Sequence, residues 1–358
     1  MMKRILVTGA GGPAGINFIK SLKIAPEKTF IVGTEASEHF IHLAPTEKKY
    51  VIPKAKETNY IDKLNETIHK EKAEFIHPQP DIEVAAVSEN REKLEANVFL
   101  PSKKTVTLCQ DKLESAKTWK RNHVLVAKFL ELHDESDIER AFEQLGNPIW
   151  IRARYGAGGR GSTPAYNKET AVAWIDYWKA RRVNWQFIAQ EHLPGRNMGF
   201  HSLWKDGELV TSMARERLQY IYPYLAPSGI TGTPTVQRTI KDETVNKTGT
   251  EAVLSIDPNF NGIACVDLKE NDEGVPCVTE INAGRMFTTS FFFSYASKIL
   301  RKDFYGNIPY LYVKLAFKET IPNMPKYNIL PTNIYWIRHV DAPARLVKNG
   351  KVLGEMYH

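Results

Sequence analysis

The first hundred residues alternate between apolar β-branched runs and amphipathic segments, and this alternation most constrains the fold. Arg4–Thr8 has the pattern of a strand, the glycine-rich segment Gly9–Gly15 follows, and Ile16–Lys23 has apolar residues at helical spacing. Further strands are expected at 30–35, 49–53 and 75–77, and further helices at 60–72 and 84–94. Strands that alternate with helices indicate a parallel, doubly wound sheet. We therefore predict an α/β domain over residues 1–104.

The glycine-rich turn after the first strand leaves two interpretations open. Such a turn lets the backbone approach an anion held at the N-terminus of the following helix. Glu35 closes the second strand 20 residues after Gly15 (35 − 15), where dinucleotide-binding proteins keep a ribose-binding carboxylate. One hypothesis is therefore a nicotinamide-dependent oxidoreductase or a sugar-nucleotide epimerase. The other is a tight strand-to-helix turn that binds no ligand.

Length, charge and cysteine content narrow the class of protein. A chain of 358 residues is long enough for about two or three domains. No run of 18 apolar residues occurs, and the N-terminus lacks the apolar core of a signal peptide. The net charge of +7 is spread without a dense basic block, and the three cysteines have no metal-binding spacing. We expect a cytoplasmic protein that binds neither membrane nor nucleic acid.

A glycine-rich segment in the middle of the chain carries several positive charges. Residues 156–161 include four glycines, and Arg152, Arg154 and Arg160 surround them. The backbone of such a segment can wrap an anion, but no Gly-Lys-Ser/Thr sequence closes it as in the Walker-type loop. We predict a flap between two strands that closes over phosphates. A flexible surface loop is the alternative.

A predicted β-hairpin at 262–285 carries three oxygen-bearing side chains. Glu280 and Asn282 are two residues apart, so they point to one face of a strand, and Asp267 lies on the partner strand. Two carboxylates and an amide oxygen suit a hard cation such as Mg²⁺, and Arg285 follows directly. Taken alone, the same pattern also fits the solvated face of an edge hairpin.

The order of these motifs resembles the ATP-grasp superfamily, especially its carbamoyl-phosphate-synthase-like and carboxylate–amine ligase members. The shared motifs are Asp111-Lys112, the flap with Ile151-Arg152, Gln190–Gly195, Gly229–Gly232 and the hairpin with Asp267 and Glu280. The resemblance implies a pre-ATP-grasp domain at 1–104 and an ATP-grasp fold of two α+β subdomains. The lid subdomain is expected at 105–190 and the large subdomain at 191–320. A β-rich tail at 321–358 is expected to pack on it.

The resemblance also implies a role for individual residues. The expected nucleotide-binding residues are Lys112, Arg152, Gly158, Gly159, Glu191, Leu193, Asn197, Gly229 and Ile230. Asp267, Glu280 and Asn282 match the ligands of one or two Mg²⁺ (or Mn²⁺) ions, while Arg285 and Arg152 match catalytic arginines. The chain departs from the family pattern at three positions. Asn197 stands where a ribose-binding carboxylate is usual, Arg285 comes one residue late, and Cys265 replaces an oxyanion-binding arginine.

The expected activity is that of an ATP- and Mg²⁺-dependent carboxylate–amine ligase that forms ADP through an acyl phosphate. Its partners would be a small-molecule carboxylate and an amine, with a homodimer as the candidate assembly. The residues from Arg215 to Tyr224 could bind the carboxylate of an acid substrate, or be surface charge and core aromatics. The oxidoreductase and a non-catalytic nucleotide sensor remain the alternatives.

Overall fold

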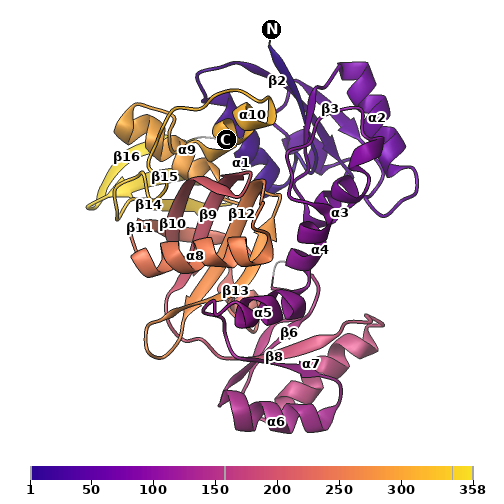
Figure 1. Ribbon diagram of the computed structural model, residues 1–358, viewed down its shortest axis with the longest axis vertical. Coiled ribbons are helices and arrows are strands. Elements are labelled where there is room, and N and C mark those ends of the chain that lie inside the picture. Colours follow the sequence, from indigo (N-terminus) through magenta and orange to yellow (C-terminus); the bar gives the residue numbers. More distant parts are fainter. Residues whose placement is uncertain (1, 157–158, 341, 357–358) are drawn as a thin grey trace.

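Three sheets organise the chain in the computed structural model, which describes residues 2–156, 159–340 and 342–356. A four-stranded parallel sheet lies at the N-terminal end, and a small antiparallel sheet lies at the opposite end of the molecule (Figure 1). Between them is an antiparallel sheet of eight strands. The predicted α/β architecture is therefore confirmed.

The parallel sheet has the strand order β3-β2-β1-β4. Its strands are β1 Lys3–Val7, β2 Thr29–Glu35, β3 Lys48–Val51 and β4 Phe75–His77. Helix α1 (Pro13–Lys23) packs on one face through Phe18, and helices α2 (Tyr60–Glu71) and α3 (Asp81–Glu89) pack on the other. Successive residues of β1 point to opposite faces, so Ile5 meets Phe18 in one core while Leu6 joins the other. The sheet is doubly wound, as predicted.

The small antiparallel sheet, which we call the lid sheet, has the order β5-β8-β6-β7. Its strands are β5 Phe129–Leu132, β6 Ile149–Ala153, β7 Thr163–Ala165 and β8 Phe187–Glu191. Helices α6 (Glu135–Leu145) and α7 (Lys168–Ala180) cover it through a core that includes Ile138 and Ala171. Both helices begin with a capping box, at Asp134 and Asn167. The glycine-rich segment is the connection from β6 to β7, as predicted.

The eight-stranded sheet, which we call the large sheet, has the order β13-β12-β9-β10-β11-β14-β15-β16. Its strands are β9 Asn197–Lys205, β10 Glu208–Tyr220, β11 Pro234–Ile240, β12 Gly262–Glu270, β13 Pro276–Ala283, β14 Tyr335–His339, β15 Ala342–Lys348 and β16 Lys351–Met356. Helices α4 (Lys103–Gln110), α5 (Lys112–Arg121) and α8 (Glu243–Ile256) cover one face. The C-terminal strands extend this sheet, because β14 pairs with β11.

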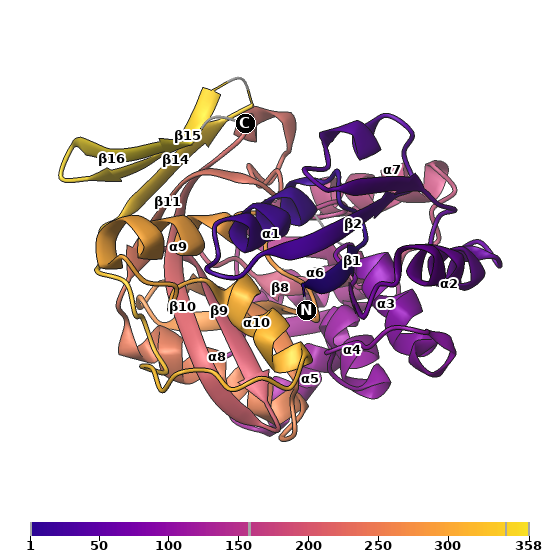
Figure 2. The same cartoon turned by 90° about the horizontal axis from the view of Figure 1, so that it is seen from above.

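An aromatic core joins the parallel sheet to the large sheet. Helix α9 (Phe291–Ala296), the π-helical turn Ser297–Arg301 and helix α10 (Ile308–Ala316) contact α1 or one another, as Figure 2 shows from above. Tyr312 on α10 makes edge contacts with Phe18 and Phe75. The side chains of Phe291, Phe292 and Phe293 on α9 are buried in this core, at 1%, 0% and 1% exposure. The parallel sheet therefore shares its core with the segments that follow β13.

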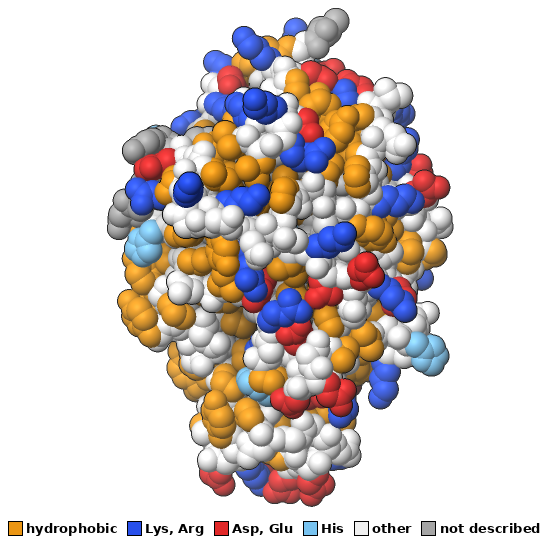
Figure 3. All heavy atoms as spheres, turned by 90° about the vertical axis from the view of Figure 1, so that its left-hand side faces the viewer, with side chains coloured by type: hydrophobic (Ala, Val, Ile, Leu, Met, Phe, Trp, Pro, Cys, Tyr) orange, Lys and Arg blue, Asp and Glu red, His pale blue; other side chains and the backbone are white. Residues whose placement is uncertain are grey.

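The surface has no single character on the face that Figure 3 presents. Lys and Arg side chains alternate there with Asp, Glu and hydrophobic side chains. In the described part of the chain, no helix has the length and apolar composition needed to cross a membrane. The short 3-10 turns are Phe40–Leu43, Arg91–Lys93 and Pro223–Leu225.

Candidate active site

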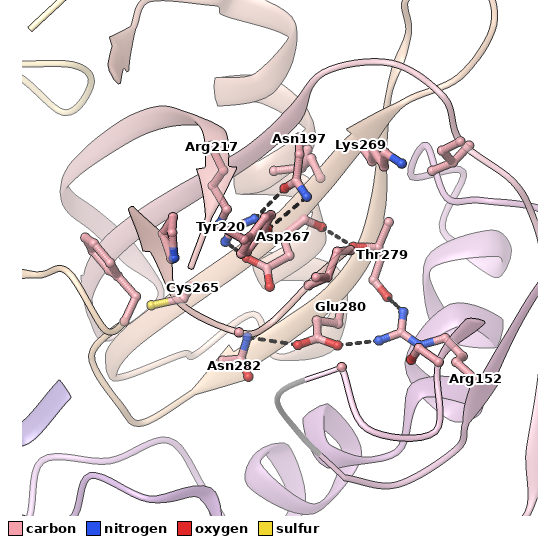
Figure 4. A pocket seen from close by; sticks show the side chains of 18 of the residues that line it. Arg152, Asn197, Arg217, Tyr220, Cys265, Asp267, Lys269, Thr279, Glu280 and Asn282 are labelled. Carbon is pink, nitrogen blue, oxygen red and sulfur yellow. Dashed lines mark hydrogen bonds and ion pairs between the residues drawn. The ribbon is translucent and has the colours of Figure 1, made fainter. Parts of the chain in front are cut away.

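A pocket opens between the lid sheet, the large sheet and the segment that joins them (Figure 4). The lid sheet contributes Trp150, Arg152 and Gln190, and the flap contributes Gly159 and Ser162. The large sheet supplies the opposite wall. Its lining residues include Asn197, Arg215, Arg217, Tyr220, Cys265, Asp267, Lys269, Thr279, Glu280 and Asn282.

Strand register places the key residues of the large sheet in one cross-strand row. Glu280 on β13 pairs with Asp267 on β12, Asp267 pairs with Gly199 on β9, and Gly199 pairs with Arg215 on β10. Directly opposed residues share a face of the sheet. Asn282 opposes Cys265 in the adjacent row on the same face. The structure thus brings the three predicted metal ligands together, from the two strands that the sequence indicated.

Each predicted metal ligand has a positively charged neighbour. Arg217 forms an ion pair with Asp267, and Arg152 of the lid sheet forms an ion pair with Glu280. Arg285 Nη2 donates to Asn282 Oδ1 at 2.5 Å. Burial opposes ionisation of Glu280, but Lys112, Arg152 and Arg285 together lower its pKa to about 2. Glu280 is therefore a carboxylate at neutral pH.

The chemistry of this donor set fits a hard divalent cation. The set offers two carboxylates and one amide oxygen, and Asn282 Nδ2 lies 3.3 Å from Glu280 Oε1. Within the described residues no group of three or more His, Cys, Asp or Glu side chains forms a metal cluster, because the third donor here is an amide. Oxygen donors of this kind suit Mg²⁺ or Mn²⁺, which complete their shells with water and phosphate oxygens.

The base of the flap is fastened to the start of helix α5. Arg154 forms a bidentate ion pair with Asp111, at 2.8 Å for Nε–Oδ1 and 2.6 Å for Nη2–Oδ2. Tyr155 donates to the same carboxylate at 2.7 Å. Lys112, which follows Asp111 in the chain, donates through Nζ to the Gly156 carbonyl at 2.5 Å. The motif Asp111-Lys112 therefore holds the flap from below.

The charged residues of the flap take different positions relative to the pocket. Arg154 turns to Asp111 and Arg160 is exposed, so of the three arginines around the glycines only Arg152 lines the pocket. The bidentate pair with Asp111 fixes Arg154 away from the pocket. Gly158 lies outside the described residues. Gly159 lines the pocket and meets the loop of Ile230, since a Cβ at Gly159 would lie 2.9 Å from the Ile230 carbonyl oxygen.

The loop after Ser228 is only partly in the pocket. Ile230 and Gly232 line the pocket, whereas Gly229 is not among its lining residues. Gly229 has φ +68°, a left-handed conformation that favours glycine, and its amide donates to the Ala226 carbonyl at 2.8 Å. Gly229 therefore shapes the loop that presents Ile230.

The segment between β8 and β9, which the resemblance implies to be the hinge, borders the pocket. Glu191 and Leu193 both line the pocket, and Leu193 is buried. Glu191 Oε1 accepts from the Lys128 amide at 2.8 Å, which fixes its side chain at the end of the lid sheet. Gly195 N donates to the Glu270 carbonyl at 3.1 Å, and this bond anchors the hinge to β12.

Asn197, the residue expected to contact ribose, already has protein partners. Its Oδ1 accepts from Arg217 Nη1 at 2.7 Å, and its Nδ2 donates to the Tyr220 hydroxyl at 3.1 Å (Figure 4). Asn197 thus orients Arg217, which in turn contacts Asp267. Lys269 opposes Asn197 in the same row and also lines the pocket. The sequence did not single out Lys269.

The side of the pocket around Cys265 contains residues that sequence reasoning left undecided. Cys265 Sγ lies 2.8 Å from His201 Nδ1, and both side chains are buried. Arg215 is 3% exposed, and its guanidinium stacks 3.9 Å from the centre of the Phe287 ring. Arg215 and Arg217 reach the pocket because residues two apart on β10 share one face. This two-residue spacing is the sequence signal that could have placed both arginines on the pocket face.

The third wall is the segment after β13, which includes Arg285, Phe287 and Thr288 and is tied to the parallel-sheet end of the molecule. Arg285 forms an ion pair with Asp81, the first residue of helix α3. Asn17 on helix α1 donates to the Thr288 carbonyl at 3.0 Å. These bonds tie the segment after β13 to the N-terminal sheet, so Arg285 is positioned from outside the large sheet.

Comparison with solved structures defines the class of this fold. The chain matches N5-carboxyaminoimidazole synthetase from Staphylococcus aureus, solved with ADP, at a TM-score of 0.71 and 16% identity; the match covers 94% of this chain and 83% of that one. It also matches the biotin carboxylase domain of the Hydrogenobacter thermophilus 2-oxoglutarate carboxylase, solved with MgADP and bicarbonate, at 0.69 and 17% identity, over 96% and 74%. The L-amino acid ligase of Bacillus licheniformis gives 0.66 and 14%, over 97% and 82%.

The chain therefore has the ATP-grasp fold that these structures share, as the resemblance drawn from the sequence predicts. Among curated proteins, the chain is 25% identical over 179 residues to the mitochondrial propionyl-CoA carboxylase alpha chain of Caenorhabditis briggsae. It is 27% identical over 179 residues to one of the pyruvate carboxylase subunits of Methanothermobacter thermautotrophicus. These matches cover 47% and 48% of this chain but only 24% and 36% of those proteins. No protein-family model matches.

Proposed function

We propose that this protein is an ATP- and Mg²⁺-dependent carboxylate–amine ligase that releases ADP and phosphate. The observation that carries the proposal is the row of Glu280 and Asp267 on β13 and β12, with Arg152 of the lid sheet paired to Glu280. A phosphoryl-transfer site needs a cation-binding carboxylate set and basic groups that close over it from another element. Asp267 and Glu280 could supply the carboxylates, and Arg152 the basic group from another element.

The first step would join the acid to the γ-phosphoryl group of ATP. A carboxylate oxygen attacks the γ-phosphorus, the bond to the β–γ bridging oxygen breaks, and ADP leaves. Arg152, Lys112 and Arg285 all lie close enough to influence the charge of Glu280, so they suit the negative charge of the transferring group. Asp267, Glu280 and Asn282 would hold Mg²⁺, which would offset the negative charge of the phosphates.

The second step would form the C–N bond. The amine nitrogen attacks the acyl carbon, loses a proton, and the phosphate leaves with the oxygen that came from the acid. A protein nucleophile is not required for either step. The flap supports the reaction by excluding water from the acyl phosphate, and its contact with the Ile230 loop lies over the same pocket.

We also propose the residue roles that the family resemblance implies. Asp267, Glu280 and Asn282 would hold the metal, and Glu191 with the Leu193 backbone would contact the adenine. Gly159 and Ile230 would lie along the nucleotide. The domain boundaries at residues 104, 190 and 320 are proposals as well. So is a homodimer, which light scattering tests by measuring the molar mass in solution.

The N-terminal glycine turn supports the ligand-free interpretation over the oxidoreductase. A Cβ at Gly11 would lie 1.9 Å from the Phe40 carbonyl oxygen, so close packing alone requires glycine there. Glu35 Oε2 accepts from the Gly11 amide at 3.3 Å. Both groups that a nicotinamide nucleotide would use therefore have partners in the protein.

Thermal stabilisation by nucleotides tests the proposal against this rival. A ligand that binds only the native state raises the melting temperature, and the rise grows with the ratio of its concentration to its Kd. We expect ATP or ADP with Mg²⁺ to raise the Tm, and NAD to leave it unchanged. A rise with NAD and none with ADP–Mg²⁺ would favour the oxidoreductase.

A further inference from the structure

Arg215 is a positive charge in the pocket without a carboxylate partner. The other pocket arginines have one each: Arg152 pairs with Glu280, Arg217 with Asp267, and Arg285 with Asp81. Among the described residues, no Asp or Glu side chain forms an ion pair with Arg215, which is 3% exposed. A buried charge without a partner is unfavourable, so such a group calls for a functional explanation.

The guanidinium of Arg215 is held in place by neutral groups. Its Nη1 donates to Gln237 Oε1 and to Thr289 Oγ1, and Phe287 stacks beneath it. Within the described residues, the hydrogen bonds of this guanidinium are made through Nη1 alone. The Nε–Nη2 edge thus retains its donors. A guanidinium edge of this kind binds a carboxylate through two parallel hydrogen bonds.

Gly199 leaves room on the pocket floor beside that edge. A Cβ at Gly199 would lie 3.4 Å from Arg215 Nε and 3.1 Å from Arg217 Nη2. Gly199 separates Arg215 from Asp267 in the cross-strand row. The free edge of Arg215 therefore faces a part of the floor that no side chain of β9 occupies.

The strand that carries Arg215 is remote from the expected phosphate end of the pocket. Arg152 approaches Glu280 on β13, whereas the backbone of Arg215 lies three strands away on β10, about 14 Å at ordinary strand spacing. The guanidinium reaches back toward that end, because its Nε lies 3.4 Å from a Cβ built on Gly199, the strand neighbour of Asp267. In the proposed reaction, the carboxylate that is phosphorylated lies near Asp267. A second group that contacts Arg215 at the same time must belong to the acid substrate or lie next to it.

A second arginine makes this region more positive. Arg338 on β14 donates through Nε to the Pro234 carbonyl at 3.2 Å and through Nη1 to the Thr288 carbonyl at 3.4 Å. Pro234 and Thr288 both line the pocket. Arg338 Nη2 is buried and has no hydrogen-bond partner within the described residues. The C-terminal strands thus contribute positive charge behind the same wall.

We propose that Arg215 binds a second carboxylate of the acid substrate, so that the substrate is a short dicarboxylic acid. This inference rests on the proposed ligase function, in which Arg285 and the metal take the carboxylate that reacts. Since Arg285 and the metal would bind the reacting carboxylate, the positive charge of Arg215 is available to a second carboxylate. Because Arg215 Nε lies over Gly199, one strand or about 5 Å from Asp267, the two binding points suit an acid whose carboxylates are a few carbons apart.

Calorimetric binding in the presence of ADP and Mg²⁺ tests the proposal without turnover. The probes are succinate, glutarate, aspartate and glutamate, each compared with its monoamide. We expect each preferred diacid to bind about tenfold or more tightly than its monoamide, as a charged hydrogen bond predicts. In Arg215→Met this preference should disappear while ADP binding persists. The Tm of the free variant should not fall, because an unpaired buried charge is removed.

Arg238→Met is the matched control, since Arg238 is also on the large sheet but pairs with Glu216 at 2.7 Å. It should lower the Tm and keep the preference for diacids. The proposal is overturned if monoamides bind as tightly as diacids, if Arg215→Met weakens both equally, if no diacid binds, or if acids with a phosphate group are preferred. Diacid binding that depends on Arg215 without any ADP formation would instead refute the ligase function alone.

Discussion

Arg152 on the lid sheet and Glu280 on the large sheet form an ion pair across the pocket. Arg152 Nη1 also donates to the Thr279 carbonyl at 3.0 Å, so the contact involves the backbone of β13 as well. The two sheets that would enclose a nucleotide are thus held together by the residues expected to contact its phosphates and metal. The ion pair therefore links the lid sheet directly to the strand that carries two of the expected metal ligands.

The first prediction concerns Glu280 itself. Glu280→Gln keeps the size of the side chain but removes the negative charge that would hold the metal. We expect ADP formation to fall by about a hundredfold or more, with the far-UV circular dichroism spectrum unchanged. Glu273→Gln, in the exposed turn of the same hairpin, is the control and should retain activity. Full ADP release by Glu280→Gln would refute the metal assignment.

The second prediction concerns the ion pair at the base of the flap. Asp111 caps helix α5, accepting from Leu113 N at 3.1 Å and Glu114 N at 3.2 Å, and it also pairs with Arg154. Asp111→Asn preserves the cap but removes the charge, because asparagine caps helices as well as aspartate does. We expect KM for ATP to rise several-fold, together with a fall in Tm from the loss of the buried ion pair. Arg160→Gln, at an exposed position of the flap, should leave KM nearly unchanged.

The third prediction concerns the open floor at Gly199. Gly199→Val would place methyl groups against Arg217 Nη2 and Arg215 Nε, which lie 3.1 and 3.4 Å from a Cβ at this position. Overpacking of this kind typically costs about 1–3 kcal/mol. We expect a folded protein with a lower Tm and weaker binding of the acid substrate. Gly274→Val in the hairpin turn is not a matched control, because Gly274 has φ +74° and valine would strain the backbone there. An unchanged affinity for the acid would show that the floor at Gly199 is not used.

The fourth prediction concerns a buried carboxyl group in the parallel-sheet domain. Glu83 is 4% exposed, and its Oε2 has no hydrogen-bond partner within the described residues. Burial raises the pKa of Glu83 to about 7, above its ordinary value of 4.5. The folded state therefore favours the protonated form, so this stabilisation is complete below pH 4.5 and is lost as the pH rises toward 7.

Glu83→Gln should remove that dependence. Relative to the wild type, we expect the variant to gain up to about 3 kcal/mol of unfolding free energy at pH 8 and little or nothing at pH 4. Urea unfolding of both proteins at the two pH values measures the difference. A variant whose stability differs from that of the wild type by the same amount at both pH values would show that folding does not raise the pKa of Glu83.

Much of the fold could be predicted from local patterns. The alternation of strands and helices before residue 104 depends on side-chain periodicity, and so does the hairpin that carries Asp267 and Glu280. The turn at Asn349-Gly350 likewise joins β15 to β16 as the dipeptide indicates. In each case the residues that determine the element are neighbours in the sequence.

The parts of the site that escaped prediction depend on contacts between distant segments. Arg154 has the charge to bind phosphate, but its bidentate pair with Asp111 occurs 43 residues away in the chain. Arg217 could not be assigned to Asp267, because β10 and β12 become near neighbours only through β9. The extension of the large sheet by β14–β16 also depends on a pairing with β11 that no local pattern specifies.

The path of oxygen from acid to phosphate tests the central claim most directly. The enzyme is incubated with ATP, Mg²⁺, hydroxylamine as the amine, and ¹⁸O-labelled dicarboxylic acids from the panel above. If the acid is activated as an acyl phosphate, the released inorganic phosphate carries one ¹⁸O from the carboxylate for each hydroxamate formed. Phosphate without label, released by any acid that stimulates ADP formation, would contradict the proposed ligase mechanism.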